Sequence, residues 1–303
     1  MSLPANPPKS PTSPTSPSAP SSPNAPVAPA APNAPEVSKA SPAPRGAAIV
    51  LVHGAWGGAW VWQRVLGPLR EAGHRVFAVS LSGVGERAHQ PSKDITLQTH
   101  IDDVKAVIDC EELTDVVLVG HSYSGMVITG VADQMRDRIA QLVYLDAVVP
   151  LPGESWSSRH TEETRQQRRA LIQAHGHLPD TPPQGMGLNA DDFAWVERRQ
   201  RPHPGGVYDS PLSFDATAWQ ALPRTFIDCN RPALLTIADF RKRVREQPGW
   251  QVFEIPTGHD AMISAAPALL DILLPLAASQ IAAQATVSPG TASPSAPGQA
   301  STR

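Results

Sequence analysis

The segment 115–126, DVVLVGHSYSGM, constrains the fold more than any other stretch of this 303-residue chain. Its first five residues are mostly apolar and β-branched, which is typical of a strand buried on both faces. The chain then turns within Gly120–Gly125 and enters an apolar helix that begins near Met126. So tight a turn between a strand and a helix exposes Ser122 at the end of the strand, where its hydroxyl can act as a nucleophile.

The small residues around Ser122 are the second part of this signal. The usual pattern of such a turn is G-x-S-x-G, because the backbone and the neighbouring strands crowd the positions two residues to either side of the serine. Gly120 meets this requirement, whereas the second position is Ser124, a small residue with Gly125 directly behind it. An ordinary turn that contains a serine would look the same, so the prediction depends on partners elsewhere in the chain.

Composition divides the chain into three parts. Residues 1–46 are almost entirely Pro, Ser, Ala, Thr and Asn, and from Pro8 to Pro35 every third residue is proline, the period of polyproline II. The C-terminal end has a similar composition. We therefore predict a disordered leader at 1–46, a folded domain at 47–282 and a disordered tail at 283–303.

Charge and cysteine content narrow the function classes. A net charge of −3 with both signs scattered argues against nucleic acid or an acidic membrane as partner. The basic run Arg241–Arg243 is interpreted as the solvated face of a helix. No segment approaches the roughly 20 apolar residues of a membrane span, and prolines interrupt any N-terminal signal sequence. Cys110 and Cys229 fit neither a disulfide framework nor a metal site, so we predict a cytoplasmic protein; the sequence leaves its oligomeric state open.

The rest of the domain alternates between buried strands and amphipathic helices. This alternation predicts an α/β fold with a doubly wound, mostly parallel sheet of about six strands, which binds ligands at the carboxyl ends of the strands. An insertion at about 150–222, richer in Arg, Gln, His and Pro, is interpreted as a helical cap. We expect strands at 47–52, 75–81, 115–119, 139–145, 224–229 and 250–255, and helices at 60–71, 96–110, 126–135, 234–246 and 262–277.

A histidine follows the last predicted strand. His259 lies in a Gly-His loop before the closing helix, downstream of the serine in chain order. A neutral imidazole there can take the Ser122 proton and return it to a leaving group. The alternative is a histidine in a surface loop, which is common.

Two backbone N–H groups are candidates for an oxyanion hole. Tyr123 follows the serine at the positive end of the next helix, and Ala55 lies in the glycine-bearing loop after the first strand. His53 in the same loop is interpreted as structural, although it could be mistaken for a base.

The acid that orients His259 is harder to choose. The strand at 224–229 is followed by residues 230–232, none of which is a carboxylate. Asp146, at the end of the strand after the Ser122 helix, is our candidate, and its alternative role is an ordinary turn contact. Asp228, inside its strand, and Asp239, inside a helix, are the competitors.

These features together resemble the α/β-hydrolase superfamily. The chain looks most similar to the branch that contains plant hydroxynitrile lyases, plant methyl esterases and their bacterial esterase relatives. The resemblance spans about 47–280 and is weakest in the cap. It rests on VLVHGAWGGAWVW at 50–62, LSGVGERAH at 81–89, VGHSYSG at 119–125 and GHDAM at 258–262.

Departures from the family pattern carry information too. Plant members resemble one another in placing the acid after the post-cap strand, so its absence here makes the chain similar to hydrolases whose acid corresponds to Asp146. The lyases have threonine and lysine at the positions of Gly54 and Asp260, so the resemblance disfavours lyase activity. Ser122 likewise differs from the aspartate nucleophile of haloalkane dehalogenases and epoxide hydrolases.

The sequence thus predicts a serine hydrolase that cleaves a small apolar or aromatic carboxylic ester through an acyl-enzyme, without metal or organic cofactor. Ser122, His259 and Asp146 would form the catalytic triad, with Ala55 and Tyr123 as oxyanion donors. A lactone hydrolase, a C–C bond hydrolase, or a cofactor-free lyase or oxygenase on the same triad is the alternative. A non-catalytic ligand-binding protein on the same scaffold is the third hypothesis.

Overall fold

A parallel sheet of six strands forms the centre of the domain. The computed structural model describes residues 46–89 and 94–287, with side chains up to residue 282. The strands follow the order β2-β1-β3-β4-β7-β8, and every neighbouring pair is parallel, which confirms the predicted doubly wound sheet. Their bounds are β1 (Ala48–Val52), β2 (Arg75–Val79), β3 (Val116–His121), β4 (Ile139–Leu145), β7 (Arg224–Cys229) and β8 (Trp250–Ile255).

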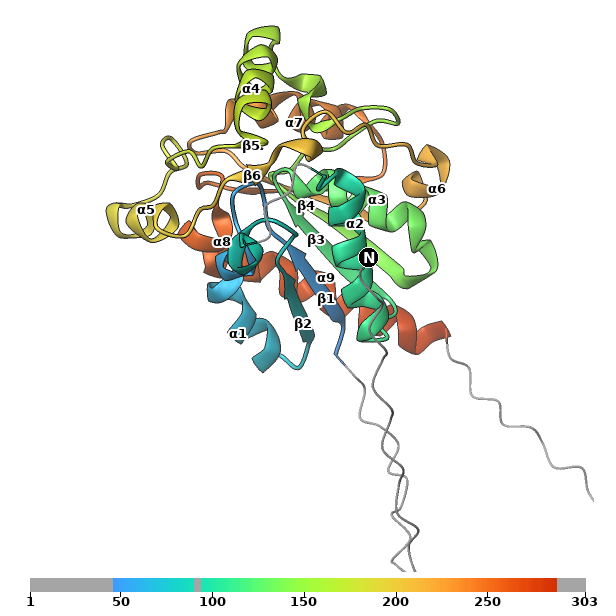
Figure 1. Ribbon diagram of the computed structural model, residues 1–303. Helices are drawn as coiled ribbons and strands as arrows, with labels where there is room; N and C mark the ends of the chain where they lie inside the picture. Colours follow the sequence, from blue (N-terminus) through green and yellow to red (C-terminus); the bar gives the residue numbers. More distant parts are fainter. Residues whose placement is uncertain (1–45, 90–93, 288–303) are drawn as a thin grey trace, which may run out of the picture. The chain divides into compact units, whose positions relative to one another are not determined.

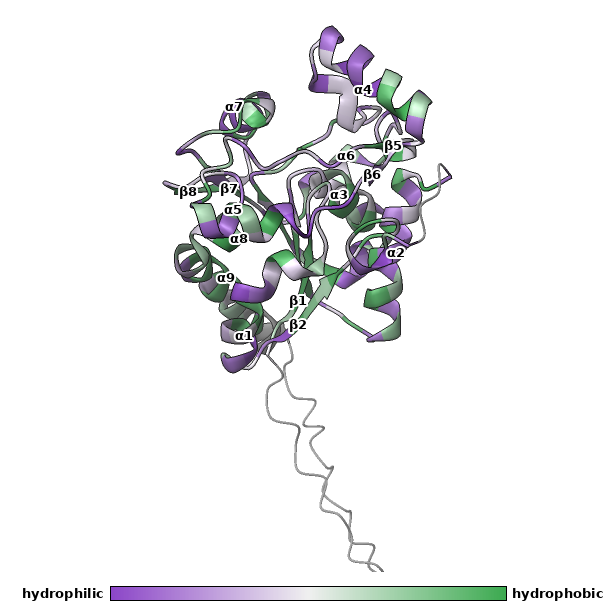
Figure 2. Ribbon diagram, turned by 60° about the vertical axis from the view of Figure 1, so that its left-hand side comes forward, coloured by the Kyte–Doolittle hydropathy of each residue, from purple (hydrophilic) through white to green (hydrophobic). Residues whose placement is uncertain are grey.

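Helices cover both faces of this sheet. Successive strand residues point to opposite faces, so Val50 and Val52 join one hydrophobic core while Ile49 and Leu51 join the other. The first face packs against α2 (Leu97–Cys110), α3 (Ser124–Gln134) and α7 (Ala238–Glu246), and the second against α1 (Gln63–Glu71), α8 (Ala261–Ser264) and α9 (Ala266–Val287). Figure 1 shows this layering, and Figure 2 shows hydrophobic residues gathered on the strands.

Several boundaries differ from the sequence prediction. The central strand starts after Asp115, whose φ of 53° is not a strand conformation, and continues to His121. The closing helix is divided into α8 and α9 at Ala265, whose φ of −143° is not helical; Pro267, in the first turn of α9, has no N–H group with which to continue the hydrogen bonds of α8. A short 3-10 helix, η1 (Ala59–Trp62), precedes α1.

The predicted leader and tail can be compared with the structure only at their edges. The leader lies outside the described residues except for Gly46, and so does the tail from residue 288 onward. Helix α9 continues through 283–287, which the sequence analysis assigned to the tail. None of the helices within the described ranges is long and apolar enough to cross a bilayer.

The segment predicted as a cap follows β4, and most of it lies over the carboxyl ends of the strands, whereas its last helix lies beside α3 (Figure 1). It contains η4 (Trp156–Arg159), α4 (Glu162–His175), β5 (His177–Leu178), α5 (Ala190–Glu197), β6 (His203–Pro204), η5 (Gly205–Val207) and α6 (Ala216–Gln220), and β5 and β6 pair antiparallel. Its helices differ in how they are held, because α4 has no buried residue whereas α5 is fixed to the body of the domain. Asp192 of α5 forms an ion pair with Arg64 of α1, and the Trp195 ring lies 4.9 Å from that of Trp60.

Candidate active site

Ser122 lies on a strained turn between β3 and α3. Its φ of 55° is in the left-handed region, which is uncommon for a residue other than glycine. The turn is closed on both sides: a Cβ at Gly120 would lie 2.8 Å from Ile128 Cγ2, and one at Gly125 would lie 1.8 Å from the Val148 carbonyl oxygen. The crowding predicted around the serine is therefore present, with Gly125 at its tightest point.

Ser124, the departure from G-x-S-x-G, is fully buried and has a bonding role. Its hydroxyl donates a hydrogen bond to the carbonyl oxygen of His53, at the end of β1. The turn that carries Ser122 is thus tied directly to the loop after β1. Glycine could not make this link.

His53 shapes that loop, as the sequence analysis predicted. Its Nδ1 donates to the Gly54 carbonyl oxygen at 2.7 Å, and its Nε2 accepts from the Leu81 N–H at 3.1 Å. Burial lowers its pKa to about 4, so the ring is neutral around pH 7. With both ring nitrogens bonded to backbone, His53 is a structural residue and not a base.

The two predicted oxyanion donors come from two different segments, the loop after β1 and the start of α3. Ala55 follows Gly54 in the β1 loop, and Tyr123 begins α3. In the turns and loops of the described residues, neither N–H donates to a backbone carbonyl. Both groups are therefore available to a ligand atom near Ser122.

His259 and Asp146 are bonded to each other. Asp146 lies at the end of β4, fully buried, with a φ of 41° and its own N–H donating to the Ile227 carbonyl oxygen at 2.8 Å. Its Oδ2 accepts a 2.6 Å hydrogen bond from Nδ1 of His259, in the loop after β8. Burial opposes the charged imidazolium, but the bond to Asp146 and its charge outweigh this effect and raise the pKa of His259 above its ordinary 6.5.

His121, which the sequence analysis left without a role, positions the loop that carries His259. Its Nε2 donates to the His259 carbonyl oxygen at 3.1 Å, and the two rings lie 4.4 Å apart. Burial and the charge of a protonated His259 hold the pKa of His121 well below its usual range. The two adjacent imidazoles are thus electrostatically distinct, and His259 is the one that takes up a proton more readily.

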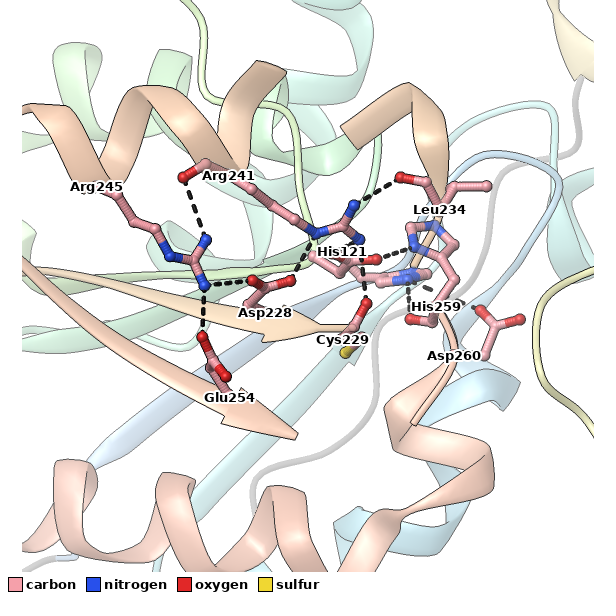
Figure 3. Close-up of polar contacts among 10 residues, drawn as sticks. His121, Asp228, Cys229, Leu234, Arg241, Arg245, Glu254, His259 and Asp260 are labelled. Carbon is pink, nitrogen blue, oxygen red and sulfur yellow. Dashed lines mark hydrogen bonds and ion pairs between the residues drawn. The ribbon is translucent and has the colours of Figure 1, made fainter. Parts of the chain in front are cut away.

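Arg241 of α7 is the main residue that sequence reasoning misplaced. It is 8% exposed, and its guanidinium joins two carboxylates, with Nη2 at 2.6 Å from Asp146 Oδ1 and Nε at 2.6 Å from Asp228 Oδ1 (Figure 3). Nη2 also donates to the Cys229 carbonyl oxygen at 3.1 Å and Nη1 to that of Leu234 at 2.7 Å. Arg241 therefore fixes the Asp146 oxygen that does not face His259.

The interpretation of residues 241–243 as a solvated face is accordingly wrong for two of the three. Arg243 is 9% exposed and bonds to Glu154 and to the Val149 carbonyl oxygen, whereas the side chain of Lys242 is 73% exposed. The cause is a set of buried carboxylate and carbonyl oxygens beneath α7, which only long cationic side chains can satisfy.

The competing acids occupy other environments. Asp228 lies inside β7, where it bonds to Arg241 and, at 2.5 Å, to Arg245, which also pairs with Glu254 (Figure 3). Asp239 lies in the first turn of α7 and lines a separate hollow with Lys242. Neither carboxylate bonds to His259, and Asp146 does.

A cavity of about 190 Å³ is lined by three of the predicted site residues, Ala55, Ser122 and His259. We call the part formed by Gly54, Ala55, Ser122 and His259 the sheet-side wall, and the part formed by Trp156, His160 and Arg168 the cap-side wall. Among the hydrogen bonds of the described residues, none joins Ser122 to His259, although both side chains line this cavity. Within those same residues, no cluster of His, Cys, Asp and Glu could hold a metal ion.

Residues 49–272 match the sequence pattern of the family described as "Alpha/beta hydrolase family". The chain belongs to the α/β-hydrolase family. The turn at Ser122, the loop after β1 and His259 all lie within the matched residues of this α/β-hydrolase.

Curated relatives of this α/β-hydrolase are named as esterases. The carbendazim hydrolyzing esterase of Nocardioides sp. (strain SG-4G) is 40% identical over 227 residues, which cover 72% of this chain and 94% of the relative. Methylesterase 3 of Arabidopsis thaliana is 27% identical over 252 residues, 76% of this chain and 95% of the relative. These matches confirm the resemblance to plant methyl esterases and bacterial esterases, and they support a hydrolase.

Solved structures agree on the fold. An extracellular α/β-hydrolase from a Paenibacillus species superposes with a TM-score of 0.67 at 21% identity, covering 76% of this chain and 98% of that structure. At this identity the likeness supports the fold and leaves the substrate open.

Proposed function

We propose that this α/β-hydrolase is a serine esterase that cleaves a small carboxylic ester through an acyl-enzyme. The observation that carries the proposal is the 2.6 Å bond between His259 Nδ1 and Asp146, with Ser122 in the same cavity. A histidine held by a carboxylate on Nδ1 presents Nε2 as a base, and a serine on a strained turn is the nucleophile that such a base activates.

In the proposed reaction, Ser122 Oγ attacks the ester carbonyl while His259 Nε2 takes the hydroxyl proton. The imidazolium that forms is stabilised by Asp146, whose other oxygen is held by Arg241. The tetrahedral oxyanion accepts hydrogen bonds from the N–H groups of Ala55 and Tyr123. His259 then donates its proton to the leaving alcohol. A water molecule, deprotonated by His259, attacks the acyl-enzyme, and His259 returns the proton to Ser122 as the carboxylic acid is released.

The size and lining of the cavity support a small substrate with apolar or aromatic groups. Its volume of about 190 Å³ is below the usual range of sites for drug-sized ligands, ~300–1,000 Å³. Trp56, Trp156, Val148 and Met186 supply apolar surface beside Ser122. The esterase names of the relatives support an ester, and carbendazim, after which one relative is named, is a substrate worth testing.

The direct test is Ser122→Ala. We expect it to abolish turnover of p-nitrophenyl acetate and covalent labelling by an organophosphonate, since no other group forms the acyl-enzyme. Ser213→Ala, at an exposed serine of the cap segment, is the matched control and should keep both. Full turnover in Ser122→Ala would end the proposal.

A substrate panel separates the proposed esterase from its alternatives. It contains p-nitrophenyl esters of increasing chain length, a naphthyl ester, a lactone and carbendazim, with product release followed by absorbance or chromatography. A serine esterase gives a burst of leaving group with the esters. Turnover of the lactone alone would move the assignment to lactone hydrolysis, and ligand binding without any burst would favour a binding protein.

A further inference from the structure

Arg168 is a partly buried cation in the cavity without an acidic partner. It lies in the middle of α4 and lines the cavity together with Ser122 and His259. Its Nη1 is buried and has no hydrogen-bond partner in the structure. A guanidinium is charged at any pH the protein meets, so leaving one of its donors unsatisfied away from water is costly.

Aromatic rings hold this guanidinium in place. Its Cζ lies 5.2 Å from the ring centroid of Trp156, 5.5 Å from Tyr208 and 5.7 Å from Trp56. The ring faces attract the cation and fix its orientation, but they accept no conventional hydrogen bond. Nη1 is therefore held in position by the rings without an acceptor of its own, although the guanidinium also bonds to the Tyr208 hydroxyl.

The neighbouring acidic groups are engaged elsewhere. On α4, Arg165 pairs with Glu162, and Arg169 pairs with Asp209, which also accepts from Ser157. His160 bonds to Tyr208 and cannot supply a negative charge; burial, with Arg168 and Arg165 nearby, lowers its pKa to about 4. Within the described residues, no carboxylate forms an ion pair with Arg168.

The carboxylates nearest to the cavity lie on its sheet side. Asp260 lines it after His259, and Asp146 lies behind the imidazole. The Arg241 ion pair balances the charge of Asp146, so an anionic group of a ligand is attracted by Arg168 and finds on the sheet side only the Asp260 carboxyl group. The cavity thus has the polarity to orient a molecule that carries an ester at one end and a carboxylate at the other.

We propose that Arg168 forms a carboxylate-binding subsite, so that the preferred substrates are small monoesters that carry a free carboxylate remote from the scissile ester. The proposal rests on the proposed esterase function and adds a substrate class to it. Guanidinium and carboxylate form two parallel hydrogen bonds, which would satisfy the unused donor at Nη1 and neutralise the partly buried charge.

The subsite is tested by a series of ring-substituted methyl benzoates, in which the carboxylate and carboxamide members have the same shape. The three probes carry carboxylate, carboxamide or methyl on the ring, as monomethyl terephthalate, methyl 4-carbamoylbenzoate and methyl 4-methylbenzoate, with the meta isomers alongside. We expect kcat/KM to fall in that order. Arg168→Met should lower kcat/KM for monomethyl terephthalate by about 10- to 100-fold, which corresponds to the energy range of hydrogen bonds to charged groups. The same variant should leave kcat/KM for methyl 4-methylbenzoate nearly unchanged.

Two further variants make the result specific. Arg168→Lys keeps the charge without the planar fork and should retain part of the preference. Arg169→Met, at the neighbouring arginine that pairs with Asp209, should keep the wild-type ratio. An equal loss on all three esters in Arg168→Met, or no wild-type preference for the carboxylate ester, would overturn the proposal.

A binding measurement separates this proposal from the esterase proposal. Calorimetry with Ser122→Ala should show tighter binding of monomethyl terephthalate than of methyl 4-methylbenzoate, and Arg168→Met in that background should remove the difference. If wild-type protein hydrolyses no ester, the esterase proposal fails while this titration still decides the subsite. Equal binding of the two compounds to Ser122→Ala would reject the subsite even if turnover is found.

Discussion

The two walls of the cavity are held together in different ways. On the sheet side, Ser124 bonds to the β1 loop, His121 to the His259 carbonyl, and Asp146 to both His259 and Arg241. The cap-side wall consists mainly of ring contacts, such as the 5.9 Å approach of Trp156 to Trp56, and contains an unused donor on Arg168. Hydrogen bonds fix the atoms that would react, whereas aromatic rings and the unpaired charge of Arg168 face the substrate.

This difference teaches how catalysis and recognition can be separated in one cavity. A reacting group must be held within a fraction of an ångström, which directional bonds achieve. A recognition surface needs complementary shape and charge, and its unsatisfied donors are satisfied only when the ligand arrives. Sheet-side changes should therefore lower kcat for every ester, and cap-side changes should alter the ranking among esters.

The largest expected effect in this comparison comes from the acid. Asp146→Asn should lower kcat on the order of 10⁴-fold on all esters, because the imidazole loses the charge that stabilises it and the tautomer it needs. Asp228→Asn is the matched control, since Asp228 bonds to the same Arg241 but does not bond to His259.

Asp228→Asn should lower the melting temperature more than kcat, since it leaves the buried Arg241 partly unpaired and removes one of the two carboxylate partners of Arg245. Steady-state kinetics and thermal melts of both variants measure the two effects. If Asp228→Asn lost more turnover than Asp146→Asn, the assignment of the acid would move to β7.

The pH dependence of kcat/KM gives the next effect. His259 acts as a base only when neutral, and its pKa is raised above 6.5, so activity should fall about tenfold per pH unit below a midpoint that lies above 6.5. In Asp146→Asn the burial that lowers this pKa remains while the bond that raises it is lost, so the midpoint should shift to lower pH. A wild-type midpoint below 6.5, or no shift in the variant, would contradict this account.

A smaller effect is expected on the cap side. Trp156→Ala should enlarge the cavity and cost about 3–5 kcal/mol of folding stability, as is typical of a truncated buried tryptophan. The ratio of kcat/KM for a naphthyl ester over p-nitrophenyl acetate should rise. Trp195→Ala, which removes a ring that packs on Trp60 and does not line the cavity, should destabilise without changing that ratio. A uniform loss on both esters in Trp156→Ala would break the proposed division between the walls.

Much of the fold was predictable because each strand is a short run of apolar residues between turn signals. The pairing of Asp146 with His259 could also be anticipated, since both follow strands whose carboxyl ends meet at one edge of a parallel sheet. The triad and oxyanion roles stay predictions until the variants are measured.

The buried arginines could not be predicted from local pattern. Arg241 bonds to Asp146, 95 residues away along the chain, and a run of charged residues in a helix looks solvated unless such partners are known. The cap was equally difficult, because its elements are short and the contacts that place Arg168 come from the β1 loop, η4 and the residue after η5. Long-range charge and ring contacts determine these positions.

The unequal attachment of α4 and α5 bears on how the cap would respond to a ligand. To move α5, the chain would have to break the Arg64–Asp192 ion pair and separate two tryptophan rings. Helix α4 has no fully buried residue, and its contacts include the Arg169–Asp209 ion pair and the rings around Arg168. A carboxylate bound by Arg168 would add a strong contact to the less deeply packed of the two helices, so ligand binding would also stabilise this part of the cap.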